Sequence, residues 1–285
     1  MYHSDERINE IAASLDSIKE CAETYFHTKK GMIPSRADTV AIVTGLQSLM
    51  FPCYFDAPAH SGKATDERLE DLLLLIKRQL TAAYSFCGES TVVDTESLAY
   101  SILEEMPRIK ELLIKDVQAI YEGDPAARSP EEVILSYPGF IAISVYRIAH
   151  ELYRLGIPYL PRIMTEYAHE KTGVDIHAGA TIGEYFFIDH GTGIVIGETT
   201  TIGDHVKIYQ GVTLGAKSFE LDEQGNPIKG IKRHPDIGNN CVIYANATIL
   251  GGNTYVGDNC IIGASVWLTR SVEPGVTLYY TPPQK

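Results

Sequence analysis

Two short clusters of polar residues carry the side chains best suited to chemistry in this sequence. The first cluster comprises Asp175, Asp189 and His190, and the second comprises Arg233 and His234. An imidazole can take a proton from a hydroxyl group near neutral pH, and a neighbouring carboxylate can orient it and stabilise its protonated form. A guanidinium grips a carboxylate through two parallel hydrogen bonds. The residue types therefore fit proton transfer at one cluster and anion binding at the other.

A six-residue repeat defines the element that must position both clusters. From about residue 173, aliphatic residues recur at this step, and small residues commonly follow them. The repeat comprises Ile176, Ile182, Ile188 and Ile194, then Ile196, Ile202, Ile208 and Leu214, then Ile237, Ile243 and Ile249, and finally Val256, Ile262 and Leu268. This is the hexapeptide pattern of a parallel β-helix. Strands of a β-sandwich would instead alternate at two residues, with a turn about every ten.

The repeat predicts where the first cluster lies. Three hexapeptide faces make one triangular coil, and successive coils stack about 4.8 Å apart. Asp175 precedes the face led by Ile176, and His190 follows Ile188 two faces later. Both side chains should therefore approach the same edge of the prism, about one coil apart. The repeat is broken directly after His190 by a register shift, and again by a polar excursion over residues 217–236, which we expect to be a loop containing the second cluster.

The first part of the chain has a helical period instead. Apolar residues recur at three- and four-residue steps near Ile8–Ile18 and Leu69–Leu80, and a helix over 97–121 should be kinked or divided at Pro107. We predict an α+β protein with an all-α N-terminal domain (residues 1–172), followed by a left-handed parallel β-helix (residues 173–273) that carries the inserted loop. The handedness is an exception to the usual right-handed crossover. Residues 274–285 are expected to form a C-terminal tail.

Composition narrows the class of function. The 285 residues carry a formal net charge of -13, which argues against binding to nucleic acid, because nucleic acid needs a basic face. No apolar run is long enough to span a bilayer, and no membrane association is expected. The five cysteines are scattered without a C-x-x-C pair, which favours reduced thiols and a cytoplasmic location.

Several motifs resemble those of bacterial serine O-acetyltransferases, which belong to the hexapeptide-repeat acyltransferases. The likeness covers roughly residues 116–268. The matching segments are Asp116–Ile120, Asp124–Ala126, Tyr146–His150, Asp175–His177, Asp189–Gly193, Ile194–Thr199, Val212–Gly215 and Arg233–Pro235. They are more specific than the repeat alone, which indicates only the superfamily.

The resemblance implies a reaction and a set of roles. Acetyl would pass from acetyl-CoA to the hydroxyl of L-serine, as the first step of cysteine biosynthesis, with no metal. His190 matches the family's general base, and Asp175 matches the carboxylate that holds it. The remaining matches are Asp124 and Asp189 for the substrate ammonium, Arg233 for its carboxylate, His234 beside its side chain, and Ala216, Ala245 and Ala264 along the pantetheine groove.

The resemblance also implies an assembly. Sites in this superfamily lie between subunits, so a homotrimer or a dimer of trimers is expected. Since His190 and the loop leave from different corners, we predict that Arg233 and His234 serve the His190 of a neighbouring subunit. L-cysteine, being isosteric with L-serine, is a plausible feedback inhibitor. The family's Gly-x-Pro-Ala segment and final isoleucine are not matched at the C-terminus, so either the sequence is truncated there or this subtype does not form the cysteine synthase complex.

Other interpretations remain open from the sequence. The chain could acetylate a sugar or antibiotic hydroxyl, although such an enzyme needs no Arg-His pair with two acids. A non-catalytic β-helix scaffold is a second alternative, and it would have no use for an Asp-His pair. His177, His190 and His205 could suggest zinc, but they follow no recognisable ligand pattern. Asp175 or Asp124 could act only as a cap, and Arg233 with His234 could only tie down the loop.

Overall fold

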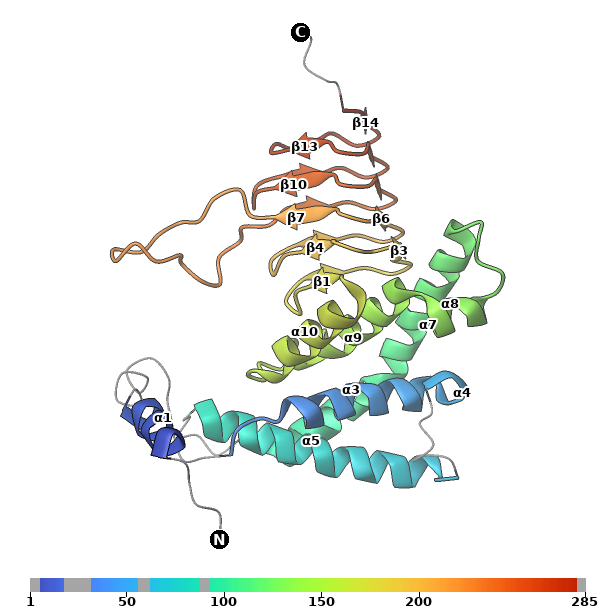
Figure 1. Cartoon of the computed structure of the whole chain (residues 1–285). Coiled ribbons are helices and arrows are strands. Elements are labelled where there is room, and N and C mark those ends of the chain that lie inside the picture. The colour runs from blue at the N-terminus through green and yellow to red at the C-terminus, as the bar shows by residue number, and fades with distance from the viewer. Residues whose placement is uncertain (1–5, 18–31, 56–61, 88–92, 281–285) are drawn as a thin grey trace.

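The computed structural model describes residues 6–17, 32–55, 62–87 and 93–280 and places helices before strands (Figure 1). The helices are α1 (Glu6–Ser17), α3 (Arg36–Met50), α4 (Pro52–Phe55), α5 (Thr65–Cys87), α6 (Thr95–Glu104), α7 (Met106–Gly123), α8 (Pro130–Ser136), α9 (Pro138–Arg154) and α10 (Leu160–Thr172). Pro107 lies in the first turn of α7 and separates it from α6 as predicted. The short helix α4 lies just after α3, and residues 56–61 lie outside the described ranges.

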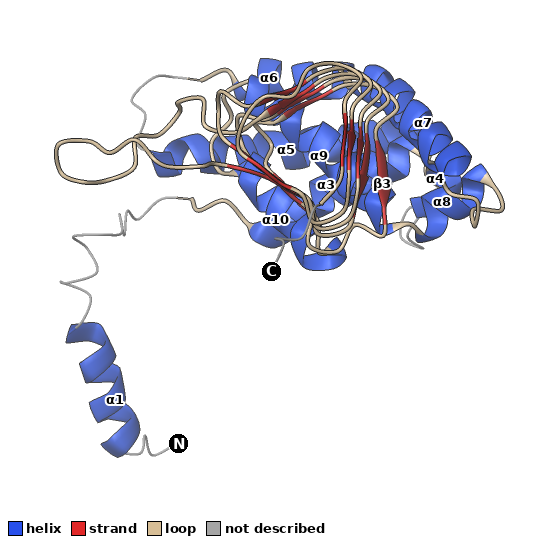
Figure 2. Ribbon diagram, turned by 90° about the horizontal axis from the view of Figure 1, so that it is seen from above, coloured by secondary structure: helices blue, strands red, loops and turns tan. Residues whose placement is uncertain are grey.

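The strands form three parallel sheets. Sheet A contains β1 (Asp175–Ile176), β4 (Val195–Ile196), β7 (Thr213–Gly215), β10 (Thr248–Leu250) and β13 (Trp267–Leu268). Sheet B contains β2 (Thr181–Ile182), β5 (Thr201–Ile202), β8 (Asp236–Ile237) and β11 (Tyr255–Val256). Sheet C contains β3 (Phe187–Asp189), β6 (Lys207–Tyr209), β9 (Val242–Ile243), β12 (Ile261–Ile262) and β14 (Thr277–Leu278). Seen from above, the sheets form the sides of a triangle (Figure 2), so the predicted β-helix is confirmed.

The prism differs from the prediction in two places, at the end of the inserted loop and at its C-terminal limit. The loop ends one residue earlier, since Asp236 already belongs to β8. The coils continue past residue 273, because β14 pairs with β12 through Ile261 and Thr277. No aliphatic–glycine pair marks this segment, and the strand forms because the edge of β12 offers backbone groups for pairing.

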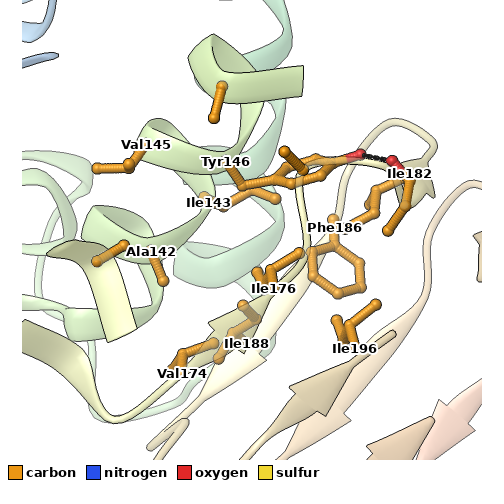
Figure 3. Close-up of a cluster of buried hydrophobic side chains, with 14 of the residues drawn as sticks. Ala142, Ile143, Val145, Tyr146, Val174, Ile176, Ile182, Phe186, Ile188 and Ile196 are labelled. Carbon is orange, nitrogen blue, oxygen red and sulfur yellow. Dashed lines mark hydrogen bonds between the residues drawn. The ribbon is translucent and has the colours of Figure 1, made fainter. Parts of the chain in front are cut away.

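Helix α9 closes the lower end of the prism. Its buried face, including Ala142, Ile143 and Tyr146, packs against Ile176 and Ile188 of the first coil (Figure 3). The Tyr146 hydroxyl donates to the carbonyl oxygen of Ala180 at 2.5 Å. An open coil would expose an apolar cross-section, so a terminal cap of this kind is what a solenoid requires.

A buried ion pair fixes the helices to the prism. Arg147 of α9 donates to both carboxylate oxygens of Asp116 of α7, at 2.5 and 2.8 Å, and also to the Gly183 carbonyl at 2.8 Å. Asp116 in turn accepts from the Phe186 backbone N–H at 2.9 Å. Both side chains are almost fully buried. The pair thus joins α7, α9 and the corner that precedes β3.

No single helix among the described residues is long and apolar enough to cross a membrane. The pair Pro130–Ser136 and Pro138–Arg154 meets the length and composition test only when taken together, and it is bent by 76°.

We expect Asp116→Ala to lower the free energy of unfolding by about 3–5 kcal/mol, because it leaves the Arg147 guanidinium buried without its partner. Lys115→Ala is the matched control. It removes an adjacent, largely exposed pair with Glu184 that also joins α7 to the prism, and it should cost less than about 1 kcal/mol. Urea unfolding of the two variants measures the difference. Equal losses would mean that the buried pair does not hold the two parts together.

Candidate functional site

His190 lies at the corner between sheets C and A, where the coil is two residues longer than a regular hexapeptide turn. His190 and Gly191 both have left-handed backbone, with φ of 56° and 83°. Histidine tolerates this region better than most residues, and glycine has no penalty there. The imidazole is 68% exposed, and its Nδ1 is 3.4 Å from Oδ1 of Asp189. The additional residues therefore carry an accessible base outward from the prism beside a carboxylate.

A second carboxylate lies beside this corner on the helical layer. Asp124 follows α7 and accepts from the Tyr137 hydroxyl at 2.6 Å and from the Ala126 N–H at 2.8 Å. The Tyr137 bond is the main reason why the pKa of Asp124 is lowered, with His190 contributing further. The same bond raises the pKa of Tyr137 to about 12. Asp124 is therefore held ionised and close to His190.

Asp175 shares the corner with His190 but does not bond to it. The Asp175 N–H donates to the Ile194 carbonyl at 2.9 Å, and Gly193 donates to Gly173 at 2.8 Å. These bonds stack the start of sheet A directly on the His190 turn, as predicted. Among the described residues no hydrogen bond or ion pair joins Asp175 to His190, whose nearest acidic partner is Asp189.

Arg233 lies at a different corner, between sheets A and B, where the inserted loop returns to the prism. Its Nη2 donates to Oε2 of Glu198 at 2.5 Å. The other oxygen of that carboxylate accepts from the Tyr153 hydroxyl at 3.1 Å. The guanidinium is thus already held by an acid, and about a fifth of its side chain is exposed.

His234 packs tightly beside Arg233. The Thr199 N–H donates to its Nδ1 at 3.1 Å, so the ring proton of the neutral imidazole is on Nε2. A Cβ on Gly197 would lie only 2.0 Å from the His234 Cδ2, so glycine is required there. The pKa of His234 is lowered to about 4, mainly because the ring is buried and secondly because of the positive charge of Arg233. At neutral pH this histidine is an uncharged hydrogen-bond donor.

The three alanines predicted to line a groove are divided between the same two corners. Ala245 and Ala264 lie above His190, where the Ser265 N–H donates to the Ala245 carbonyl at 2.9 Å. Ala216 follows β7 at the Arg233 corner. There a cavity of about 510 Å³ opens between the loop and the prism, lined by residues that include Lys217, Phe219, Ile228, Lys232, Arg233 and Asn253.

The zinc alternative gains no support from these positions. His177 lies at the Arg233 corner, where its Nδ1 accepts from the Gly179 N–H at 3.0 Å. His205 stacks on Tyr185 at the corner between sheets B and C, with ring centroids 4.4 Å apart. The three histidines thus occupy three different corners of the chain.

One other group within the described ranges could hold a metal ion by distance alone. It comprises Glu166, His169 and Asp175, whose ligand atoms lie within 4.8 Å of one another. Glu166 already pairs with Arg162, and His169 is exposed.

The structure thus divides the predicted residues into two half-sites. One holds a base and two acids at the corner between sheets C and A, and the other holds Arg233 and His234 at the corner between sheets A and B. Sequence reasoning missed the residues that hold them, namely Tyr137, Glu198, Thr199 and Tyr153. Glu198 and Thr199 lay within a recognised motif, whereas nothing in the sequence linked Tyr137 to Asp124.

Comparisons with known proteins agree on one family. Residues 83–145 match the family described as serine acetyltransferase, N-terminal. A relative from Synechococcus elongatus, described as "Serine acetyltransferase, plasmid", is 49% identical over 257 residues, which cover 85% of this chain and 80% of the relative.

Solved structures show the same likeness. Serine acetyltransferase 1 of Entamoeba histolytica in complex with L-cysteine matches with a TM-score of 0.73 and 41% identity, covering 84% of this chain and 86% of that one. A serine acetyltransferase from Brucella abortus in complex with coenzyme A matches with a TM-score of 0.59 and 25% identity, covering 96% and 89%.

The lowered pKa of His234 predicts a pH dependence of stability. Between its ordinary pKa of 6.5 and its folded value of about 4, the unfolded chain binds a proton that the folded chain does not. Stability from this group is therefore complete above pH 6.5 and is lost progressively as the pH falls towards 4. Urea unfolding across this range should show a flatter profile for His234→Asn, which keeps an acceptor for Thr199.

His205→Asn is the control for that experiment, since it removes an exposed histidine from the third corner. Its stability profile should follow that of the unmodified chain. If His234→Asn leaves the slope unchanged as well, His234 does not resist protonation in the fold.

Proposed function

This chain belongs to the serine acetyltransferase family, and from that membership we propose that it transfers acetyl from acetyl-CoA to the hydroxyl of L-serine. The products are O-acetyl-L-serine and CoA, and the reaction is the first step of cysteine biosynthesis from serine. The proposal is supported, in addition to family membership, by the arrangement of side chains at the His190 corner. An exposed imidazole there stands beside Asp189 and close to the ionised Asp124.

We propose that His190 acts as the general base. It takes the proton from the serine hydroxyl while the oxygen attacks the thioester carbonyl. When the tetrahedral intermediate collapses, the carbon–sulfur bond breaks, and His190 returns the proton to the departing sulfur. Asp175, at the same corner, is proposed to orient the imidazole once a substrate is bound. Catalytic hydrogen bonds of this kind are often formed only in the complex.

The two half-sites are proposed to meet between subunits of a homotrimer. Asp124 and Asp189 suit the ammonium group of the amino acid, because both are anionic and face the base. Arg233 suits the carboxylate, and His234 can donate from Nε2 to the substrate. Sheet A separates these pairs within one chain. A neighbouring subunit would therefore supply Arg233 and His234, and the alanines of the two corners would face each other along the pantetheine arm.

We propose two further properties, inhibition by L-cysteine and action in the cytoplasm. L-cysteine differs from L-serine only in having sulfur in place of oxygen, so it should occupy the same pocket and inhibit. The relative solved with L-cysteine supports this view. The free thiols at Cys53, Cys87, Cys241 and Cys260 are compatible with action in the cytoplasm.

We expect His190→Ala to lower kcat by about 10²–10⁴-fold, because the serine hydroxyl loses its base. His205→Ala is a matched control, since His205 is also an exposed corner residue with φ of 56°, and it should retain full activity. The assay follows thiol release from acetyl-CoA with L-serine, D-serine, L-homoserine and a galactoside. Turnover of the galactoside in preference to L-serine would contradict the proposed substrate.

The shared site predicts complementation between inactive chains. His190→Ala and Arg233→Ala proteins should each be nearly inactive alone. Mixed trimers, formed by joint refolding, should recover activity, because some interfaces combine an intact His190 with an intact Arg233 from the neighbour. The opposite result is that the two variants assemble into mixed trimers but recover no activity. In that case the whole site would lie within one subunit.

A further inference from the structure

A stacked pair of tyrosines stands on the outer surface of sheet C. Tyr209 of β6 and Tyr244, which follows β9, have ring centroids 5.2 Å apart and an interplanar angle of 11°. Tyr209 is half-buried, and Tyr244 is 42% exposed. The preceding residues, Ile208 and Ile243, point into the core of the prism, so both rings lie outside it.

The strand register places Tyr209 one coil above a candidate acid. Asp189 of β3 pairs with Tyr209 of β6, and the two strands lie on neighbouring coils in Figure 1. Paired residues on adjacent parallel strands point to the same side and lie about 4.8 Å apart. Asp189 is also the acid next to His190. Tyr209 therefore stands over the candidate catalytic corner.

The stack covers only one face of the Tyr209 ring. Tyr244 lies on the coil above, because Ile208 pairs with Ile243. The centroid separation of 5.2 Å is close to the spacing of the coils, so both rings lie roughly across the prism axis. The lower face of Tyr209 is directed at the coil of Asp189, where Phe187 meets it in a T-shaped contact with centroids 5.8 Å apart.

The end of α7 brings the second acid to the same place. Gly123 lies so close to Phe187 that a Cβ there would be 2.6 Å from the ring, and Asp124 follows it directly. The pKa of Tyr209 is raised, mainly because it is partly buried, with further contributions that include the negative charges of Asp189 and Asp124. Both carboxylates are therefore near this tyrosine, which stays uncharged near neutral pH.

The aromatic residues of this surface already hold one cation. The Lys207 Nζ lies 5.3 Å from the centroid of the Phe187 ring. The face of an aromatic ring carries partial negative charge and attracts an ammonium group within about 6 Å. The lower face of Tyr209 offers the same attraction to a cation that the two carboxylates would bind.

We propose that Tyr209 is a binding residue for the substrate ammonium group. The ammonium lies between Asp124 and Asp189, with the lower face of the Tyr209 ring against it. The carboxylates supply the opposite charge, and the ring adds a cation–π contact while it excludes water from that side. This inference rests on the proposed function and adds a residue that selects for a free α-amino group.

Substitution of the ring tests the contact through the KM for L-serine. Tyr209→Leu should raise this KM about five- to tenfold, as expected for the loss of one cation–π contact. Tyr209→Phe, which keeps the ring, should stay within about twofold. The KM for acetyl-CoA should not change in either variant. Tyr255→Leu, which removes a tyrosine that is 45% exposed on sheet B, is the control and should leave both constants unchanged.

A graded change of the ring separates a cation contact from a packing role. The ring introduced by Tyr209→Phe can carry one, two or three fluorine atoms, which weaken its π-face and nearly preserve its shape. The KM for L-serine should rise with each fluorine, while the KM for acetyl-CoA stays constant. The same series at Tyr244→Phe, whose ring covers only the upper face, should have a much smaller effect. A KM for L-serine that stays constant along the series at position 209 overturns the proposal.

Calorimetric binding of L-serine, without acetyl-CoA, separates this inference from the proposed function. If the unmodified protein acetylates L-serine and Tyr209→Leu binds it equally well, only this inference fails. If the unmodified protein binds L-serine but transfers no acetyl, and Tyr209→Leu weakens the binding, the ammonium site stands and the proposed reaction is wrong. A chain that does not bind L-serine at all contradicts both.

Discussion

Parallel stacking of triangular coils is the constraint on which the rest of this molecule depends. Backbone hydrogen bonds between coils fix every outward side chain to one of three faces or three corners, and no loop flexibility can bring two corners together. His190 and Arg233 lie on either side of sheet A for this reason. Since one chain cannot close a site around both, the chemistry proposed for them requires a second subunit. The proposed assembly would therefore follow from the fold itself.

The same constraint explains why the base stands where the repeat is broken. Regular turns at this corner have a single left-handed residue, such as Gly211, Asn246 or Ser265. The first turn adds His190 and Gly191 ahead of Gly193, its own left-handed residue. His190 is thus the first of the residues that enlarge this turn. The additional residues move it outward, towards Asp124, and the helical layer supplies that acid only because Asp116 and Arg147 hold α7 and α9 against the first coil.

Much of this arrangement could be read from the sequence, and what could not has a physical cause. The six-residue period identified the prism, because each aliphatic residue must fill a narrow core, and the break after His190 marked the corner. Counting residues along the repeat was therefore enough to assign each of them to an edge of the prism. Asp124 and Tyr137 could not, since their approach to His190 depends on how helices α7 to α9 pack on the prism. The strand β14 was missed because Thr277 and Leu278 lack the glycine that marked other turns.

The contrast between the two histidines shows how the fold divides their tasks. His190 is exposed on an enlarged turn, where a proton can arrive and leave. His234 is buried against Gly197, its Nδ1 is occupied by the Thr199 N–H, and its pKa is lowered to about 4. A group in that state cannot serve as a base near neutral pH, but it presents a fixed N–H to whatever lies beside it. Exchanging the environments of the two rings, with the sequence motifs intact, would remove both of their proposed roles.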